Sequence, residues 1–88
     1  MAMPNASGKL DVSVRNRSNV LFDGKVNSVT SHSGAGEFDV LPQHANFVTL
    51  IKDMIVINKG RSDEKKIEVK SGGLMNVGQD KIDVYLGI

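Results

Sequence analysis

The chain has 88 residues, of which 40% are hydrophobic and 24% are charged, a composition typical of one soluble domain with a modest core. Its net charge of +1 favours neither nucleic acid nor an anionic membrane surface as a partner. It contains no cysteine, which excludes disulfides, thiolate metal sites and thiol catalysis. No apolar run approaches the ~20 residues that span a bilayer, and the first residues lack the apolar segment of a secretory signal. We therefore expect a cytoplasmic domain without direct membrane insertion.

Short alternating or β-branched apolar segments recur along the chain and predict β-strands. Residues 9–15, 66–70 and 82–86 alternate between apolar and polar side chains, as strands with one buried and one exposed face do. No window shows apolar residues at helical spacing, and nine glycines interrupt the chain. The strands predicted in this way are 9–15, 20–22, 25–31, 47–51, 54–57, 66–70, 74–77 and 82–86.

Polar and glycine-containing segments separate the predicted strands. Asp23 and Gly24 are typical of a hairpin turn, and 58–63 is suited to a hairpin tip. Short strands with such turns between them predict an all-β fold, a two-layer sandwich of about ten short, mainly antiparallel strands. Residues 1–8 are expected to be a flexible arm and residues 9–88 to be the sandwich domain.

One segment, 36–45, combines two polar side chains with two residues that restrict or relax the backbone. Gly36 permits a sharp turn just before Glu37. Pro42 fixes its own φ and favours an extended residue before it, so His44 is expected at a defined offset from Glu37. On its own, Glu37 is most simply interpreted as a solvated carboxylate, and His44 as a surface or structural histidine whose titration makes a pH-sensitive contact an option.

Four blocks in order give the sequence a family resemblance: Leu10–Val12, Leu21–Gly24, Gly36–Ala45 and Ser71–Val77. Together they resemble the epsilon subunit of F-type ATP synthases, over residues 10 to 86. The resemblance implies an amino-terminal β-sandwich at the foot of the rotor, which binds the gamma subunit along one side and the polar loops of the c-ring at its tip.

The resemblance also implies roles for individual residues. Glu37 and His44 match the c-ring-facing positions of the family, and the strand that contains Phe47, Thr49 and Ile51 is expected to face gamma. The residues expected to shape the loops are Gly36, Pro42, Gly72 and Gly73.

This sequence departs from the family pattern in two places. Asp39 and Gln43 stand where the family usually has glycines, so the c-ring-facing loop is expected to differ locally. The given sequence stops at Ile88, whereas many members continue into an α-helical hairpin that inhibits hydrolysis and sometimes binds ATP. Without that hairpin, neither ATP binding nor any other cofactor is expected.

The implied function is a non-catalytic coupling subunit of the central stalk, which links gamma to the c-ring for rotary proton-driven ATP synthesis. The expected location is peripheral, on the cytoplasmic side of the inner membrane. An enzyme is disfavoured because the serines and the two histidines form no recognisable nucleophile motif and no metal-ligand spacing.

The alternative is a free-standing ligand-binding or carrier β-domain unrelated to ATP synthase. Lys52 only poorly approximates the exposed hairpin lysine that a carrier domain needs. One Tyr, three Phe and no Trp offer few stacking platforms for an oligonucleotide.

Overall fold

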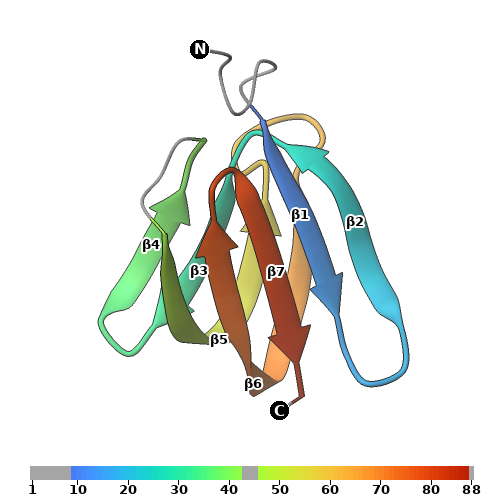
Figure 1. Cartoon of the computed structure of the whole chain (residues 1–88), viewed down its shortest axis with the longest axis vertical. Coiled ribbons are helices and arrows are strands. Elements are labelled where there is room, and N and C mark those ends of the chain that lie inside the picture. The colour runs from blue at the N-terminus through green and yellow to red at the C-terminus, as the bar shows by residue number, and fades with distance from the viewer. Residues whose placement is uncertain (1–8, 43–45, 88) are drawn as a thin grey trace.

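The computed structural model describes residues 9–42 and 46–87, which form strands and turns with no helix between them (Figure 1). The strands are β1 (Leu10–Arg15), β2 (Val20–Val26), β3 (Val29–Ser33), β4 (Gly36–Val40), β5 (Phe47–Ile57), β6 (Lys65–Gly78) and β7 (Lys81–Leu86). They hydrogen-bond in the order β2-β1-β7-β6-β5-β3-β4. Neighbours are antiparallel except β1 and β7, which are parallel. The prediction of an all-β, mainly antiparallel fold is confirmed.

The two layers arise because β5 and β6 bend together. Their first pairing joins Phe47–Ile51 to Gly73–Val77, and their second joins Asp53–Ile57 to Lys65–Val69, with a register shift between Ile51 and Asp53. Backbone φ angles of +70° at Asp53 and +80° at Gly72 lie at this bend. Since β7 pairs with the later half of β6 and β3 mainly with the later half of β5, the sheet folds over on itself, as Figure 1 shows.

The described strands number seven, rather than about ten. Two predicted breaks are bends inside continuous strands, while β4 is a strand that the sequence pattern does not predict. The sequence predicts that Lys52–Asp53 ends one strand and 71–73 another, yet the β5–β6 ladder resumes on the far side of both. A bulge lets paired strands turn a corner without separating.

The predicted hairpin turn at Asp23 and Gly24 is wrong. Both residues lie inside β2, where they pair with Ser13 and Val12 of β1. The chain instead turns at 27–28, between β2 and β3. Pairing along the whole of β1 outweighs the local turn preference of an Asp-Gly dipeptide, and Gly24 has no positive φ of the kind that such a turn requires.

The core lies between the two layers. In β1 and β7, the first and last strands of the chain, it follows the alternation that the sequence predicts. Leu10, Val12 and Val14 of β1 are buried, as are Ile82 and Val84 of β7. The layer that contains β3, β4 and the later half of β5 contributes mainly β-branched residues. The layer that contains β1, β7 and the later half of β6 contributes one methionine, Met75. The remaining members of the core are Val26, Val29, Val40, Ile51, Ile55, Ile57, Val69, Met75, Val77 and Leu86.

A buried asparagine ties two turns together at one end of the sandwich. Asn58 Oδ1 accepts a hydrogen bond of 2.7 Å from the backbone N–H of Asn27, and its Nδ2 donates one of 3.0 Å to Asp63. The backbone N–H of Asn58 donates to the carbonyl of Ser28 at 3.0 Å. These bonds fix the β2–β3 turn against the β5–β6 loop.

Residues 1–8, predicted to be an arm, lie outside the described residues, so the arm and the domain boundary stay predictions. In the part of the chain that the structure describes, no helix is long and apolar enough to cross a membrane.

Candidate docking surfaces

Glu37 lies in a strand and not in the proline-braced loop that the sequence predicts for it. The chain turns at Gly34 and Ala35, and Gly36 then has a φ of +117°, an angle that favours glycine. Glu37 follows as the second residue of β4 and pairs with His32 of β3. Pro42 lies beyond the opposite end of β4. Glu37 and the proline loop are therefore at opposite ends of one strand.

The other member of the predicted c-ring-facing pair, His44, lies outside the described residues, as does Gln43. Asp39 is within β4, where its carboxylate accepts a hydrogen bond from the hydroxyl of Thr30 on β3. The roles of Glu37 and His44 toward a c-ring are not tested by this geometry and stay predictions.

Both carboxylate oxygens of Glu37 have a partner. Oε2 lies 3.0 Å from Nζ of Lys59, and Oε1 lies 3.3 Å from Nε2 of His32. The hydrogen bond from Lys59 lowers the pKa of Glu37 most, and the bond from His32 lowers it further. In return, Glu37 raises the pKa of Lys59. The carboxylate is thus held as an anion above the β3–β4 hairpin.

His32 extends this network to the bend of β5. Its Nδ1 lies 3.1 Å from Oδ2 of Asp53, the residue whose φ is positive at the bend. A depression of about 200 Å³ lies beside the network, with Met54 and Val56 among its apolar lining residues. The His32 side chain is 26% exposed, so the network is partly shielded from solvent. We call His32, Glu37, Asp53 and Lys59 the charge chain.

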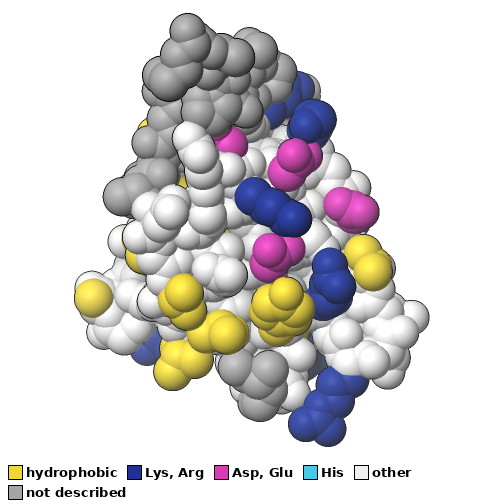
Figure 2. Space-filling view, viewed as in Figure 1, with side chains coloured by type: hydrophobic (Ala, Val, Ile, Leu, Met, Phe, Trp, Pro, Cys, Tyr) yellow, Lys and Arg dark blue, Asp and Glu magenta, His cyan; other side chains and the backbone are white. Residues whose placement is uncertain are grey.

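An exposed apolar surface lies on the outer face of the layer that contains β1, β7, the first half of β5 and the later half of β6. Val48 is 61% and Leu50 is 67% exposed. Leu50 pairs with Leu74, and Leu74 pairs with Tyr85, so three neighbouring strands place apolar side chains in one row. Figure 2 shows apolar side chains gathered on the lower part of this face. We call Val48, Leu50, Leu74 and Tyr85 the apolar patch.

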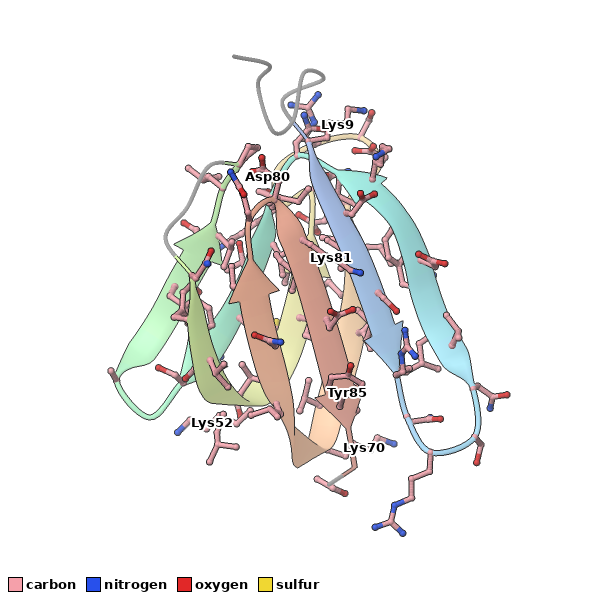
Figure 3. All side chains as sticks on the ribbon, viewed as in Figure 1. Lys9, Lys52, Lys70, Asp80, Lys81 and Tyr85 are labelled. Atoms are coloured by element: carbon pink, nitrogen blue, oxygen red, sulfur yellow. The ribbon has the colours of Figure 1, made fainter. Side chains whose placement is uncertain are left out.

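Charged side chains cover the rest of the same face. Arg15 borders the apolar patch, because it pairs with Tyr85. Beyond it, a shallow depression of about 300 Å³ is lined by charged groups of both signs, with Lys25 and Asp11 forming an ion pair of 3.0 Å nearby. Tyr85 lies toward the lower end of β7 and Lys81 toward its upper end (Figure 3). Along β7, this face therefore changes from the aromatic Tyr85 to the charged Lys81.

The residues predicted to face gamma point mostly the other way. Ile51 is 3% exposed and belongs to the core. Phe47 packs against the core and meets the ring of Phe38 edge-on, with centroids 6.1 Å apart. Thr49 is partly buried. The gamma-facing role of these three residues stays untested, but on this strand the exposed apolar surface belongs to their neighbours, Val48 and Leu50.

Two of the glycines predicted to shape loops, Gly72 and Gly73, lie inside β6, at its bend. Gly72 has a φ of +80°. A Cβ on Gly73 would lie 2.7 Å from Cδ2 of Leu86, 3.0 Å from the carbonyl oxygen of Tyr85 and 3.3 Å from Cγ1 of Ile51. Gly73 is therefore required for close packing of three strands beside the apolar patch.

The described residues form no group of three or more His, Asp or Glu side chains able to hold a metal ion. What the fold and its surfaces define is a small β-sandwich with an exposed apolar patch and a separate charge chain. This is the class of an interaction domain.

Comparison with known proteins identifies the family. The family described as the β-sandwich domain of the ATP synthase delta/epsilon chain matches residues 9–86. The chain belongs to this family, which excludes the alternative of a carrier or ligand-binding domain unrelated to ATP synthase.

Relatives in two bacteria agree. The ATP synthase epsilon chain of Sulfurovum sp. is 43% identical over 54 residues, which cover 60% of this chain and 42% of the relative. That of Brevibacillus brevis is 30% identical over 76 residues, which cover 86% of this chain and 58% of the relative. The chain spans about half the length of the curated relatives it matches.

Solved structures share the fold. A chain of the Euglena gracilis mitochondrial ATP synthase (OSCP/F1/c-ring) superposes with a TM-score of 0.79 at 16% identity, covering 93% of this chain and 52% of that chain. A chain of the Tetrahymena thermophila mitochondrial ATP synthase (central stalk/c-ring) superposes with a TM-score of 0.68 at 14% identity, covering 91% of this chain and 64% of that chain.

Proposed function

We propose that this β-sandwich is a non-catalytic docking domain of an ATP synthase central stalk, which couples a gamma subunit to a membrane c-ring during rotary, proton-driven ATP synthesis. Membership of the delta/epsilon family supports this proposal. The fold is shared with chains in structures described as c-ring and central-stalk assemblies. The domain would act as a peripheral component on the cytoplasmic side of the membrane.

The observation that carries the proposal is the apolar patch. Large contiguous apolar surfaces on a small domain mark partner sites, and both Val48 and Leu50 are more than half exposed. An aromatic side chain, Tyr85, is the register partner of Leu74, which in turn pairs with Leu50, and central interface contacts favour aromatic residues. We assign the apolar patch to gamma, in place of the three inward-pointing residues of β5.

The second contact of the proposal is with the ring, through the end of the sheet that carries Glu37. Its carboxylate is exposed on the surface and anionic, with its pKa lowered by Lys59 and His32. A charged group in a fixed position sets register and orientation at an interface more than it adds affinity. Glu37 would thus help to define how the domain sits on the ring loops, and the contact of His44 with the ring stays a separate prediction.

The experiment that tests this function is capture of co-expressed gamma subunit and c-ring from the same genome by the tagged chain. Stable capture of gamma is the expected result. Absence of capture, with gamma folded and both proteins at micromolar concentration, would contradict the proposed function. Proton pumping measured beside ATP hydrolysis in the reconstituted complex then tests coupling, with Glu37→Ala and His44→Ala as the variants.

A further inference from the structure

His32 lies between two carboxylates, one on each ring nitrogen. Nδ1 faces Asp53 at 3.1 Å and Nε2 faces Glu37 at 3.3 Å. Asp53 belongs to the bend of β5 and Glu37 to the start of β4, so the imidazole bridges two segments of the chain. Neither carboxylate is adjacent to His32 in sequence, and the docking function above does not account for this arrangement.

The number of protons on the ring decides how many of these contacts can form. An imidazolium has two N–H donors, whereas a neutral imidazole has one donor and one acceptor. Carboxylates accept hydrogen bonds and do not donate them when ionised. Both contacts of His32 are therefore hydrogen bonds only in the imidazolium form, and the neutral form places a nitrogen lone pair against a carboxylate oxygen.

The structure indicates which contact the neutral form keeps. The contact with Asp53 is the shorter, and His32 is the single hydrogen-bond partner of the Asp53 carboxylate within residues 9–42 and 46–87. Glu37, in contrast, has Lys59 as a second partner at 3.0 Å. A proton retained on Nδ1 leaves Asp53 paired and frees Oε1 of Glu37, which is the better-satisfied arrangement.

Other charges surround the ring, and they come from every element that packs beside it. Glu37 and Asp39 come from β4, while Lys52, the cross-strand neighbour of His32, and Asp53 come from β5. The groups contributed by the β5–β6 loop and by β6 around the depression are Lys59, Glu64 and Lys66. Four carboxylates face three lysines here, so the proton on His32 decides whether the charge chain is neutral or carries one excess negative charge.

We propose that His32 is a proton-dependent latch for Glu37. As an imidazolium, it holds the Glu37 carboxylate against the bend of β5. As a neutral imidazole, it keeps Asp53 and releases Oε1 of Glu37 to a docking partner. Histidine is the side chain whose charge changes most readily between about pH 5 and pH 8, and loss of the ring proton opens the latch. The partner half of this inference rests on the proposed function, whereas the latch itself is a property of the free chain.

The latch is tested on the free chain by NMR. Imidazole ¹⁵N signals of His32 and the carboxyl ¹³C signal of Glu37 are followed together from about pH 5 to pH 9, with His32→Gln as the variant that removes the ring. We expect the Glu37 signal to move in step with deprotonation of His32, the neutral ring to carry its proton on Nδ1, and His32→Gln to abolish the step. Lys66→Met is the control, because Lys66 lines the same depression and, within the described residues, makes no hydrogen bond or ion pair with Glu37. A Glu37 signal that stays constant while the ring loses its proton, or a neutral ring protonated on Nε2, would overturn the latch.

The partner half is tested by capture of purified c-ring at about pH 6 and about pH 8. Wild type and Lys66→Met are expected to bind about two- to five-fold more tightly at the higher pH, the range that one exposed ion pair provides, and His32→Gln to lose this difference. If Glu37→Gln weakens binding of the c-ring but the wild type binds it equally tightly at the two pH values, the release of Glu37 to the partner is overturned. No binding at either pH would contradict the proposed function and leave the latch decided by the NMR titration.

Discussion

The guanidinium of Arg15 lies over the ring of Tyr85, with its central carbon 5.7 Å from the ring centroid. The two residues are register partners in the one parallel pairing of the sheet. Such a contact is favourable by about 0.5–1 kcal/mol at an exposed site. It restrains the aromatic member of the apolar patch and sets a positive charge at the border of the docking face.

Replacement of Leu50 by serine should weaken capture of gamma about tenfold or more, because truncation of a central apolar contact commonly costs more than about 1 kcal/mol. Leu50 is 67% exposed, so the fold itself should be little affected. Affinity is measured by titration of the purified chain into gamma. Met54→Ser is the control, because Met54 is an exposed apolar residue beside the charge chain, on the opposite layer from the apolar patch. Equal losses of affinity for gamma in the two variants would contradict the assignment of the apolar patch to gamma.

Replacement of Gly73 by alanine should destabilise the domain by about 1–3 kcal/mol, the usual cost of forcing extra volume into a packed site. The new Cβ would meet the side chain of Leu86 at 2.7 Å and the backbone of Tyr85 at 3.0 Å. Urea unfolding followed by circular dichroism measures the change. Gly34→Ala is the matched control, since nothing lies within 4 Å of the position that its methyl group would take and its φ is not in the left-handed region, and it should leave the unfolding free energy within about 0.5 kcal/mol.

Replacement of Asn58 by alanine should cost about 1–3 kcal/mol, because it leaves the partly buried backbone N–H of Asn27 without its acceptor. The φ of +54° at Asn58 adds to the cost, since asparagine tolerates this conformation better than alanine does. Asn76→Ala, at an exposed position of β6, should change stability by less than about 0.5 kcal/mol. Equal unfolding midpoints for the two variants would show that the clamp between the turns contributes nothing.

Glu37 should make stability depend on pH in the acid range. Its pKa is lowered in the folded chain, first by the hydrogen bond from Lys59 and then by that from His32. Its contribution is therefore present above the ordinary pKa of glutamate and is lost as the pH falls through the lowered value. Lys59→Met should move the pKa of Glu37 back toward its ordinary value, which carboxyl ¹³C titration detects, and Glu37→Gln should reduce the loss of stability on acidification. An unchanged Glu37 titration in Lys59→Met would argue against the ion pair in solution.

The strands with strict alternation were predictable from the sequence. In β1 and β7, every second side chain is apolar, and those side chains are the ones that the structure buries. The family blocks also led to the correct family. Local patterns sufficed here because alternation reports directly on which face of a strand meets the core.

The inward and outward sides of the first half of β5 were not predictable in the same way. Residues 47–51 are apolar at four positions out of five, so no alternation distinguishes the buried Ile51 from the exposed Leu50 beside it. The exposed apolar side chains of the apolar patch obscure the pattern, and the proposed docking function accounts for their exposure. The departure from alternation is thus itself a signal of function.

The charge chain was not predictable from the sequence, because it joins residues that only the bend brings together. In the sequence, His32 is an isolated histidine and Asp53 reads as a strand break. Their contact at 3.1 Å depends on register shifts in two ladders, one between Ser31 and His32 and one between Ile51 and Asp53. Strand assignment from one sequence contains no information on such shifts.

The position of β7 between β1 and β6 has a consequence for how the chain folds. Among the described strands, the hairpin of β1 and β2 joins the rest of the sheet through β7, and β1 pairs with β7 in parallel, Asp11 opposite Lys81. This pairing closes a loop that includes all the chain between β1 and β7, which is entropically costly. Folds dominated by contacts between residues distant in sequence are also slow to form. The parallel pairing of β1 with the sheet therefore cannot form until the seventh strand has emerged from the ribosome, and closure of the sandwich is expected to be a late step in folding.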